Sequence, residues 1–148
     1  MPYAELHCLT NHSFLRGASH PEELVERAAD CGYSALAITD ECSLAGVVKA
    51  HVAAKRRGLH LVIGSEFHLV EGIHLIALAP TRDAYAELSG LISRSRRRSI
   101  KGEYTTRLRD VIFHLKRCFI IWLPRDSDLE ESVGQQTHRN KHTREPQG

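Results

Sequence analysis

The chain has 148 residues, of which 42% are hydrophobic and 26% charged, and 20 Lys and Arg against 18 Asp and Glu give a formal charge of +2. This composition is typical of a soluble globular protein and excludes strongly acidic or low-complexity classes. The sequence has neither an apolar run of about 18 residues nor a charged and then apolar leader. We therefore expect no membrane association and a cytoplasmic location.

The four cysteines are Cys8, Cys31, Cys42 and Cys118, and no two of them have C-x-x-C spacing. This spacing argues against a zinc ribbon or a redox motif. Without an export signal, a disulfide framework is also not expected. We predict four reduced thiols.

Residues 125–148 contain Leu129 and Val133 as their only large apolar residues. Burying two side chains cannot offset the entropy lost on ordering 24 residues. We therefore predict a disordered or non-native tail over 125–148, which leaves residues 1–124 for one domain at most.

The first half of the chain predicts two βα units. Residues 3–10 alternate loosely and predict a strand, followed by a polar loop. Ser19 and Glu22 have the spacing of a capping box, which predicts a helix that starts there and ends at Gly32. Residues 35–40 form a short apolar run, typical of a strand buried on both faces.

The alternation continues along the rest of the chain. We predict a helix over 44–57, strands over 59–67 and 73–79, a helix capped by Thr81 and a last strand over 118–124. Alternating strands and helices favour an α/β fold with largely parallel strands. Five strands and three or four helices are about half of what a closed (β/α) barrel needs, so we predict a partial barrel.

Several candidate ligands lie near predicted strand ends, where parallel α/β folds gather their chemistry. His7 lies in the first strand, Asp40 and Glu41 end the second, Glu66 lies in the third and His74 opens the fourth. Imidazoles and carboxylates that converge there could bind Zn, Mn or Fe. We interpret the other histidines as surface or hydrogen-bonded side chains; they include His12, His20, His51, His60 and His68.

Residues 93–109 form a basic segment with one acidic residue, Glu103. Such a segment either follows a phosphate backbone or covers a solvated helix end, and the sequence leaves both readings open. The candidate phosphate contacts are Arg94, Arg96, Arg97, Arg98 and Lys101. No glycine-rich nucleotide loop, nucleophile elbow or EF-hand loop is present in the sequence.

The order of the blocks ELHCLTNHSFLRGAS, GYSALAITDECSLAGVV, GLHLVIGSEF, HLIALA and LISRSRRRSIKGEY resembles a known family. It is similar to the N-terminal PHP (polymerase and histidinol phosphatase) domain of bacterial C-family DNA polymerases, and most closely to their error-prone branch. The similarity covers residues 3 to about 124. It implies part of a distorted seven-stranded (β/α) barrel, a fold that holds up to three metals at its C-terminal rim.

The family's metal motifs are only partly kept. The first reads H-x-H-[ST]-x-x-S followed by Asp-Gly; here His7 is kept, but Leu9 replaces the second His and Arg16 replaces the Asp. The second motif ends T-D-H, and Glu41 stands at its His. Glu66 and His74 match the third and fourth motifs. The resemblance thus implies a remnant metal site at His7, Glu66 and His74. We expect no cofactor for this chain, and the sequence leaves residual binding of Zn or Mn open.

An arginine at position 16 opposes a metal site, because it puts a fixed positive charge where cations would bind. We expect Arg16 to pair instead with Glu41 or Glu66 and to hold the rim together without metal.

The resemblance implies a fragment of an error-prone DNA-directed DNA polymerase, which acts in DNA replication, repair and damage-induced (SOS) translesion synthesis. The fragment itself would be a catalytically silent scaffold. Its partners would be the rest of the polymerase chain and, through it, DNA, the sliding clamp and accessory mutasome proteins. Two alternatives stay open: a metal-dependent phosphoesterase of the PHP family and a nucleic-acid-binding module.

Overall fold

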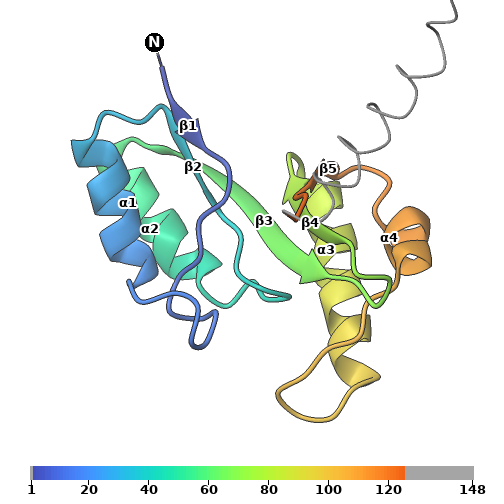
Figure 1. The fold of residues 1–148 in the computed structure, drawn as a ribbon. Coiled ribbons are helices and arrows are strands. Elements are labelled where there is room, and N and C mark those ends of the chain that lie inside the picture. Colours follow the sequence, from blue (N-terminus) through green and yellow to red (C-terminus); the bar gives the residue numbers. More distant parts are fainter. Residues whose placement is uncertain (1, 126–148) are drawn as a thin grey trace, which may run out of the picture.

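A computed structural model describes residues 2–125 of the chain (Figure 1). Along the sequence the elements are β1 (Ala4–Glu5), α1 (Pro21–Asp30), β2 (Ala35–Ile38), α2 (Val47–Arg57), β3 (His60–His68), β4 (His74–Ala79), α3 (Arg82–Arg97), α4 (Leu108–His114) and β5 (Phe119–Trp122). The predicted tail covers residues 125–148, and all of these except Arg125 lie outside the described residues, so the boundary at residue 124 stays a prediction. No helix of the described part is long and apolar enough to cross a membrane.

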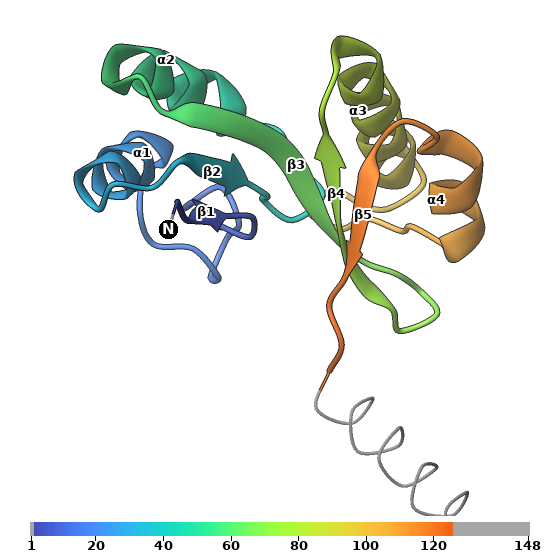
Figure 2. The same ribbon diagram turned by 90° about the horizontal axis from the view of Figure 1, so that it is seen from above.

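The five strands form one curled sheet in the order β1-β2-β3-β4-β5. Figure 2 shows α1 and α2 beside the β1–β3 part of the sheet and α3 and α4 beside the β4–β5 part, with the long strand β3 running between them. This arrangement confirms the predicted partial α/β barrel.

The expectation of largely parallel strands holds for one half of the sheet only. β1, β2 and β3 are parallel, whereas β3 with β4 and β4 with β5 are antiparallel. The cause is the short turn from Leu69 to Ile73, which is closed by two hydrogen bonds. Gly72 N–H donates to the Leu69 carbonyl at 2.9 Å, and Leu69 N–H donates to the Ile73 carbonyl at 2.8 Å. A parallel crossover needs a dozen or more residues, so this connection permits only a hairpin.

The first helix begins one residue later than predicted. Its N-cap is His20, whose N–H donates to the Glu23 carboxylate at 2.8 Å, so the predicted Ser19–Glu22 box is wrong. Pro21 explains the shift, because proline favours the first helical position and holds the residue before it in an extended conformation. The predicted cap of α3 is confirmed, since Thr81 Oγ1 accepts from Ala84 N–H at 3.2 Å.

Two further boundaries differ from the expectations. The strand predicted over 3–10 pairs with β2 only at Ala4 and Glu5, because beyond Glu5 the chain is held by other bonds, including Thr39 N–H to the Cys8 carbonyl at 2.8 Å. Helix α2 starts at Val47 rather than residue 44, and it ends as predicted at Gly58, whose φ of +67° closes the helix in the left-handed region.

The core is divided between the two halves of the sheet. One cluster packs α1 and α2 on β2, with Val25, Leu36, Ile38 and Ala50 almost fully buried. The other is centred on Phe67 and joins α3 and α4 to β3 and β4. The four cysteines form no disulfide, as predicted, and burial raises the pKa of the Cys8 and Cys118 thiols to about 11 and that of Cys42 to about 12.

Candidate metal centre and its ion-pair cluster

The buried carboxylate of Glu66 is the centre of the candidate site. Glu66 lies near the end of β3 with no solvent exposure. The pairing of β2 and β3 continues beyond Ile38 as an isolated bridge between Glu41 and Glu66, in which Glu66 N–H donates to the Asp40 carbonyl and Cys42 N–H to the Glu66 carbonyl. This extension sets the Glu41 and Glu66 side chains at the same edge of the sheet.

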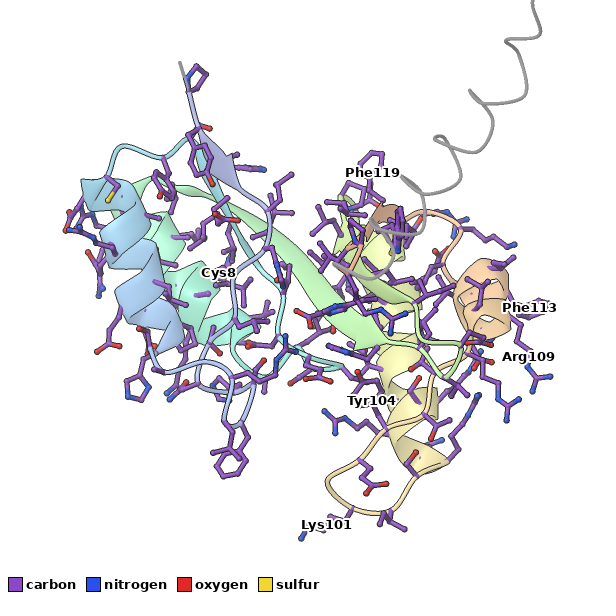
Figure 3. All side chains as sticks on the ribbon, in the orientation of Figure 1. Cys8, Lys101, Tyr104, Arg109, Phe113 and Phe119 are labelled. Carbon is purple, nitrogen blue, oxygen red and sulfur yellow. The ribbon has the colours of Figure 1, made fainter. Side chains whose placement is uncertain are left out.

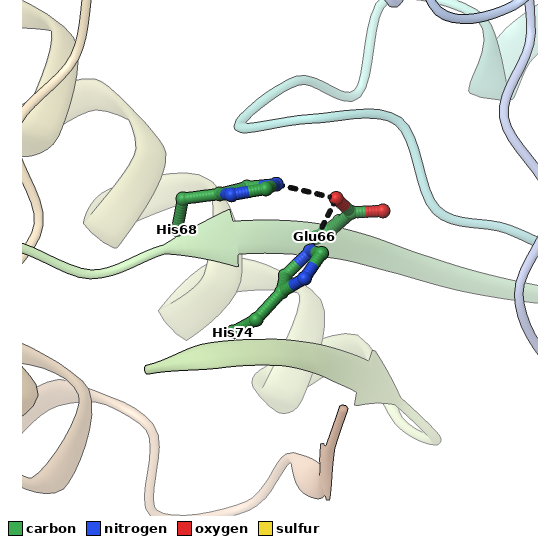
Figure 4. A group of neighbouring side chains, drawn as sticks. All are labelled: Glu66, His68 and His74. Carbon is green, nitrogen blue, oxygen red and sulfur yellow. Dashed lines mark hydrogen bonds and ion pairs between the residues drawn. The ribbon is translucent and has the colours of Figure 1, made fainter. Parts of the chain in front are cut away.

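Three imidazoles converge on the Glu66 carboxylate. His7 Nε2 lies 2.5 Å from one carboxylate oxygen. His68 Nε2 and His74 Nε2 lie 2.8 and 2.5 Å from the other oxygen, and Figure 4 shows these two contacts. His68 follows Glu66 by two residues and so shares its face of β3, while His74 is the cross-strand partner of His68 on β4. The rings of His68 and His74 pack with their centroids 3.7 Å apart.

Arg16 completes the cluster and connects its two carboxylates. One guanidinium nitrogen donates to Glu66 Oε1 at 2.6 Å and to Glu41 Oε2 at 2.8 Å. Arg16 was expected to pair with Glu41 or Glu66, and it contacts both. Leu9, half-buried at the position of the family's second histidine, offers no ligand atom.

The loop that carries Arg16 is anchored by the buried Asp40. Its carboxylate accepts from Thr10 N–H and Thr10 Oγ1 at 2.8 Å and from Ser13 Oγ at 2.7 Å. At Gly17 an added Cβ would lie 2.0 Å from the Thr10 carbonyl oxygen, so only glycine permits this return of the loop. Asp40 therefore positions Arg16 although it does not contact it.

Electrostatics keep both carboxylates of the cluster ionised. Burial alone raises the pKa of Glu66, but hydrogen bonds from His7, Arg16, His74 and His68 outweigh it and hold that pKa far below its usual value. Burial likewise raises the pKa of Glu41, and hydrogen bonds from Arg16 and Tyr104 more than reverse this, so its pKa is also lowered.

Tyr104 links the site to the segment after α3. Its hydroxyl donates to Glu41 Oε1 at 2.8 Å and accepts from His68 N–H at 2.9 Å. Figure 3 shows Tyr104 between the sheet and the loop that carries Lys101. Burial raises the pKa of Tyr104, so it stays a hydroxyl donor. Nothing in the sequence pattern indicates this role of Tyr104.

The basic segment is mostly engaged within the chain. Arg96 donates to the carbonyls of Glu41 and Cys42 at 3.3 and 3.2 Å and lies 5.3 Å from the centre of the Tyr104 ring. Arg98 pairs with Asp110 of α4 at 2.7 Å, and Arg94 contacts His114. The exposed side chains of Arg97 and Lys101 are the two candidate phosphate contacts without such a role among the described residues.

Glu66, His68 and His74 can supply three ligand atoms to one ion, since these atoms all lie within 4.8 Å of one another. One carboxylate and two imidazoles suit Zn, and also Mn or Fe. The position of Arg16 opposes a metal ion at this site, because its guanidinium donates to the same Glu66 oxygen that His68 and His74 contact. A cation bound there would have to displace Arg16.

The three residues that can supply ligand atoms to one ion differ in part from the ligands that the sequence predicted. Glu66 and His74 belong to it, and His7 lies on the other oxygen of Glu66. His68 was interpreted as a surface or hydrogen-bonded histidine; it is exposed and hydrogen-bonded, and it also faces the site. The signal that could have identified it is its two-residue spacing from Glu66, which puts both side chains on one face if the strand predicted over 59–67 continues by one residue.

Comparisons with known proteins agree with this architecture. Residues 5–123 match the family model of the PHP domain. An error-prone DNA polymerase from Saccharophagus degradans is 63% identical over 124 residues, and one from Teredinibacter turnerae is 59% identical over 124 residues. Each match covers 84% of this chain and 12% of the relative, so the chain spans about 12% of the length of these curated relatives.

Two solved structures are similar in fold. A candidate metal-dependent phosphoesterase from Bifidobacterium adolescentis is 25% identical with a TM-score of 0.53, covering 78% of this chain and 44% of that one. An amidohydrolase from Chromobacterium violaceum, which has bound sulfate and no metal, is 30% identical with a TM-score of 0.54, covering 64% of this chain and 33% of that one.

Proposed function

This chain belongs to the PHP domain family, and from that premise we propose that it is the amino-terminal piece of an error-prone DNA-directed DNA polymerase and serves there as a structural scaffold. The proposal is supported by relatives of that name at 59% and 63% identity, of which the chain spans 12%. Nucleotidyl transfer would belong to the remaining part of such a polymerase.

The observation that carries the scaffold role is the double ion pair of Arg16. This residue connects Glu41 and Glu66, which form the isolated bridge beyond the end of β2, and so it links the two neighbouring chain segments at the rim of the sheet. Glu66 is fully buried, and a buried carboxylate needs a charged or hydrogen-bonding partner. Arg16 satisfies that need where a phosphoesterase would use a metal ion.

In the whole polymerase the domain would act indirectly. We place it in DNA replication, repair and translesion synthesis during the SOS response, in the cytoplasm, with DNA, the sliding clamp and accessory mutasome proteins as partners of the complete chain. The rim that Arg16 holds together would give the following polymerase regions a surface on which to pack.

Metal analysis after dialysis, combined with a p-nitrophenyl phosphate assay, tests the scaffold role. We expect weak Zn or Mn binding and no metal-dependent hydrolysis by the wild-type chain. Arg16→Asp, which restores a carboxylate, should tighten metal binding at least about tenfold, or about 1.4 kcal/mol. Lys101→Asp makes the same charge change on an exposed loop and is the matched control.

The result that would refute the scaffold role is a wild-type chain with two or three bound metal ions and metal-dependent turnover. That outcome would establish the second candidate function, a metal-dependent phosphoesterase. The ligand geometry of Glu66, His68 and His74 favours this candidate, since these residues can supply one ion with a carboxylate and two imidazoles.

A further inference from the structure

The ion-paired residues Arg16 and Glu41 each have a neighbour in a strained backbone conformation. Among the described residues other than glycine, only Leu15 and Cys42 have a positive φ, of 61° and 44°. Leu15 directly precedes Arg16, and Cys42 directly follows Glu41. Residues other than Gly, Asn and Asp rarely adopt this left-handed conformation, because Cβ then crowds the backbone. The strain therefore lies on both sides of one ion pair.

The turn at Leu15 has no side-chain packing that would explain its strain. Arg16 N–H donates to the Ser13 carbonyl at 3.0 Å, so Leu15 holds the third position of a four-residue turn, where a positive φ favours Gly or Asn. The Leu15 side chain is 90% exposed. Its conformation is therefore imposed by the two ends of the turn, which are anchored by the ion pairs of Arg16 and by the bond from Ser13 Oγ to Asp40.

The turn at Cys42 is held by residues that follow in the sequence. Arg96 donates to the carbonyls of both Glu41 and Cys42. Cys42 N–H donates to the Glu66 carbonyl at 2.9 Å. Tyr104 fixes the Glu41 side chain through its bond to Oε1. A strained backbone persists only where its surroundings determine it in this way, and such strain is concentrated at functional sites and in switch regions.

Arg16 is the group that can leave this arrangement. Its side chain is 34% exposed, whereas Glu66 has no exposure, and three imidazoles would still contact Glu66 after Arg16 had left. We propose that the Arg16–Glu41 ion pair is a latch held closed against backbone strain, and that its release relaxes the strained turns and frees Glu66 for a divalent cation. The proposal rests on the scaffold role, which corresponds to the closed latch.

The strain makes the latch an element with two states of comparable free energy. The buried carboxylate of Glu66 favours the closed state, in which Arg16 satisfies it, and the strain in two turns subtracts from that preference. A cation that binds only the open state binds with an affinity reduced to the fraction of molecules that are open. A substitution that relieves strain in the closed state must therefore weaken cation binding, even when it touches no ligand.

Leu15→Asn tests this coupling in the 148-residue chain, by urea unfolding without metal and by calorimetric titration with Zn²⁺. Asn tolerates the left-handed region, so we expect a more stable chain and a Zn²⁺ dissociation constant raised by about fivefold. Phe14→Asn is the matched control, because Phe14 is 84% exposed in the same turn and its φ is not positive. It should leave both quantities nearly unchanged.

Arg96→Gln tests the other turn. It removes the bonds to the Glu41 and Cys42 carbonyls, so the latch should open more often and the Zn²⁺ dissociation constant should fall by about threefold or more. Arg97→Gln removes the same charge from the neighbouring, exposed side chain. This control should change the dissociation constant by less than about twofold, because solvent and salt screen an exposed charge.

Equal dissociation constants for Leu15→Asn and Phe14→Asn overturn the latch, even if Leu15→Asn stabilises the chain, because the strain would then not be coupled to Arg16. An equal fall in Arg96→Gln and Arg97→Gln would be a general charge effect and overturns it too. So does the absence of Zn²⁺ binding by every variant up to about 1 mM. Failure of the scaffold role is distinct, since it requires bound metal and metal-dependent hydrolysis in the wild-type chain.

Discussion

Replacing Glu66 by Gln should strongly destabilise the domain. The substitution conserves shape but removes the charge that Arg16 and three imidazoles contact. Removing one partner of a buried ion pair costs about 3–5 kcal/mol, a large fraction of the roughly 5–15 kcal/mol that stabilises a typical domain. At about 4 °C per kcal/mol for a domain of this size, the melting temperature should fall by about 12–20 °C.

The destabilisation should depend on pH with a defined sign. The pKa of Glu66 is lowered in the folded chain, so its ionised form contributes stability that is complete above its unfolded pKa of about 4.3 and is lost as the pH falls toward the folded value. Urea unfolding at several pH values between 5 and 3 should therefore show the gap between wild type and Glu66→Gln narrowing as the pH is lowered.

An exposed acid provides the control for this experiment. Glu103→Gln should change the free energy of unfolding by less than about 0.5 kcal/mol, because Glu103 is exposed and its one side-chain contact among the described residues, from Arg96, goes to its main-chain carbonyl, which the substitution keeps. The reasoning would be refuted if Glu66→Gln lay within about 1 kcal/mol of wild type at pH 7. It would also be refuted by a gap that stayed constant between pH 5 and 3.

Three more predictions concern the surroundings of the site. Gly17→Ala should destabilise the chain by more than about 2 kcal/mol in urea unfolding, because its Cβ would collide with the Thr10 carbonyl; a neutral effect would mean that the loop moves freely. Asp110→Asn should cost about 1–2 kcal/mol, since Asp110 pairs with Arg98 and accepts from the N–H of Arg107, the N-cap residue of α4; a loss below about 0.3 kcal/mol, within the range of surface substitutions, would contradict this. Arg97→Ser should leave the salt dependence of DNA affinity unchanged, whereas a fall of about 0.9 in the slope of log K against log salt would identify a phosphate contact.

Much of the fold could be predicted from local pattern. The strands around residues 36 and 76, the Thr81 cap and the end of α2 at Gly58 follow from short-range rules that the structure obeys. The antiparallel half could also have been predicted, because the turn from Leu69 to Ile73 is too short for a crossover. Helix α4 was harder, because it has only seven residues, which is too short for a helical apolar period to be recognised.

The part of the candidate site that follows from a residue at a motif position could be predicted from the sequence. The part that depends on contacts between residues far apart in the sequence could not. Arg16 at a ligand position is visible in the motif, and its charge directly implies the carboxylate partners. Tyr104, in contrast, reaches Glu41 across 63 residues of sequence. Arg96 has the composition expected of a phosphate contact, and only the fold shows that it donates to main-chain carbonyls.

The change from parallel to antiparallel pairing at β3 has a consequence for the order in which the chain folds. Residues paired between β3 and β4 are at most 16 positions apart, whereas Ala35 pairs with His60 and Leu75 with Trp122 across 25 and 47 positions. Closing a short loop loses less entropy and is faster. The hairpin would therefore form first and present one edge to β2 and the other to β5, so that the two halves of the sheet assemble on it independently. Slow folding phases should then belong to either half separately, with the hairpin as their common nucleus.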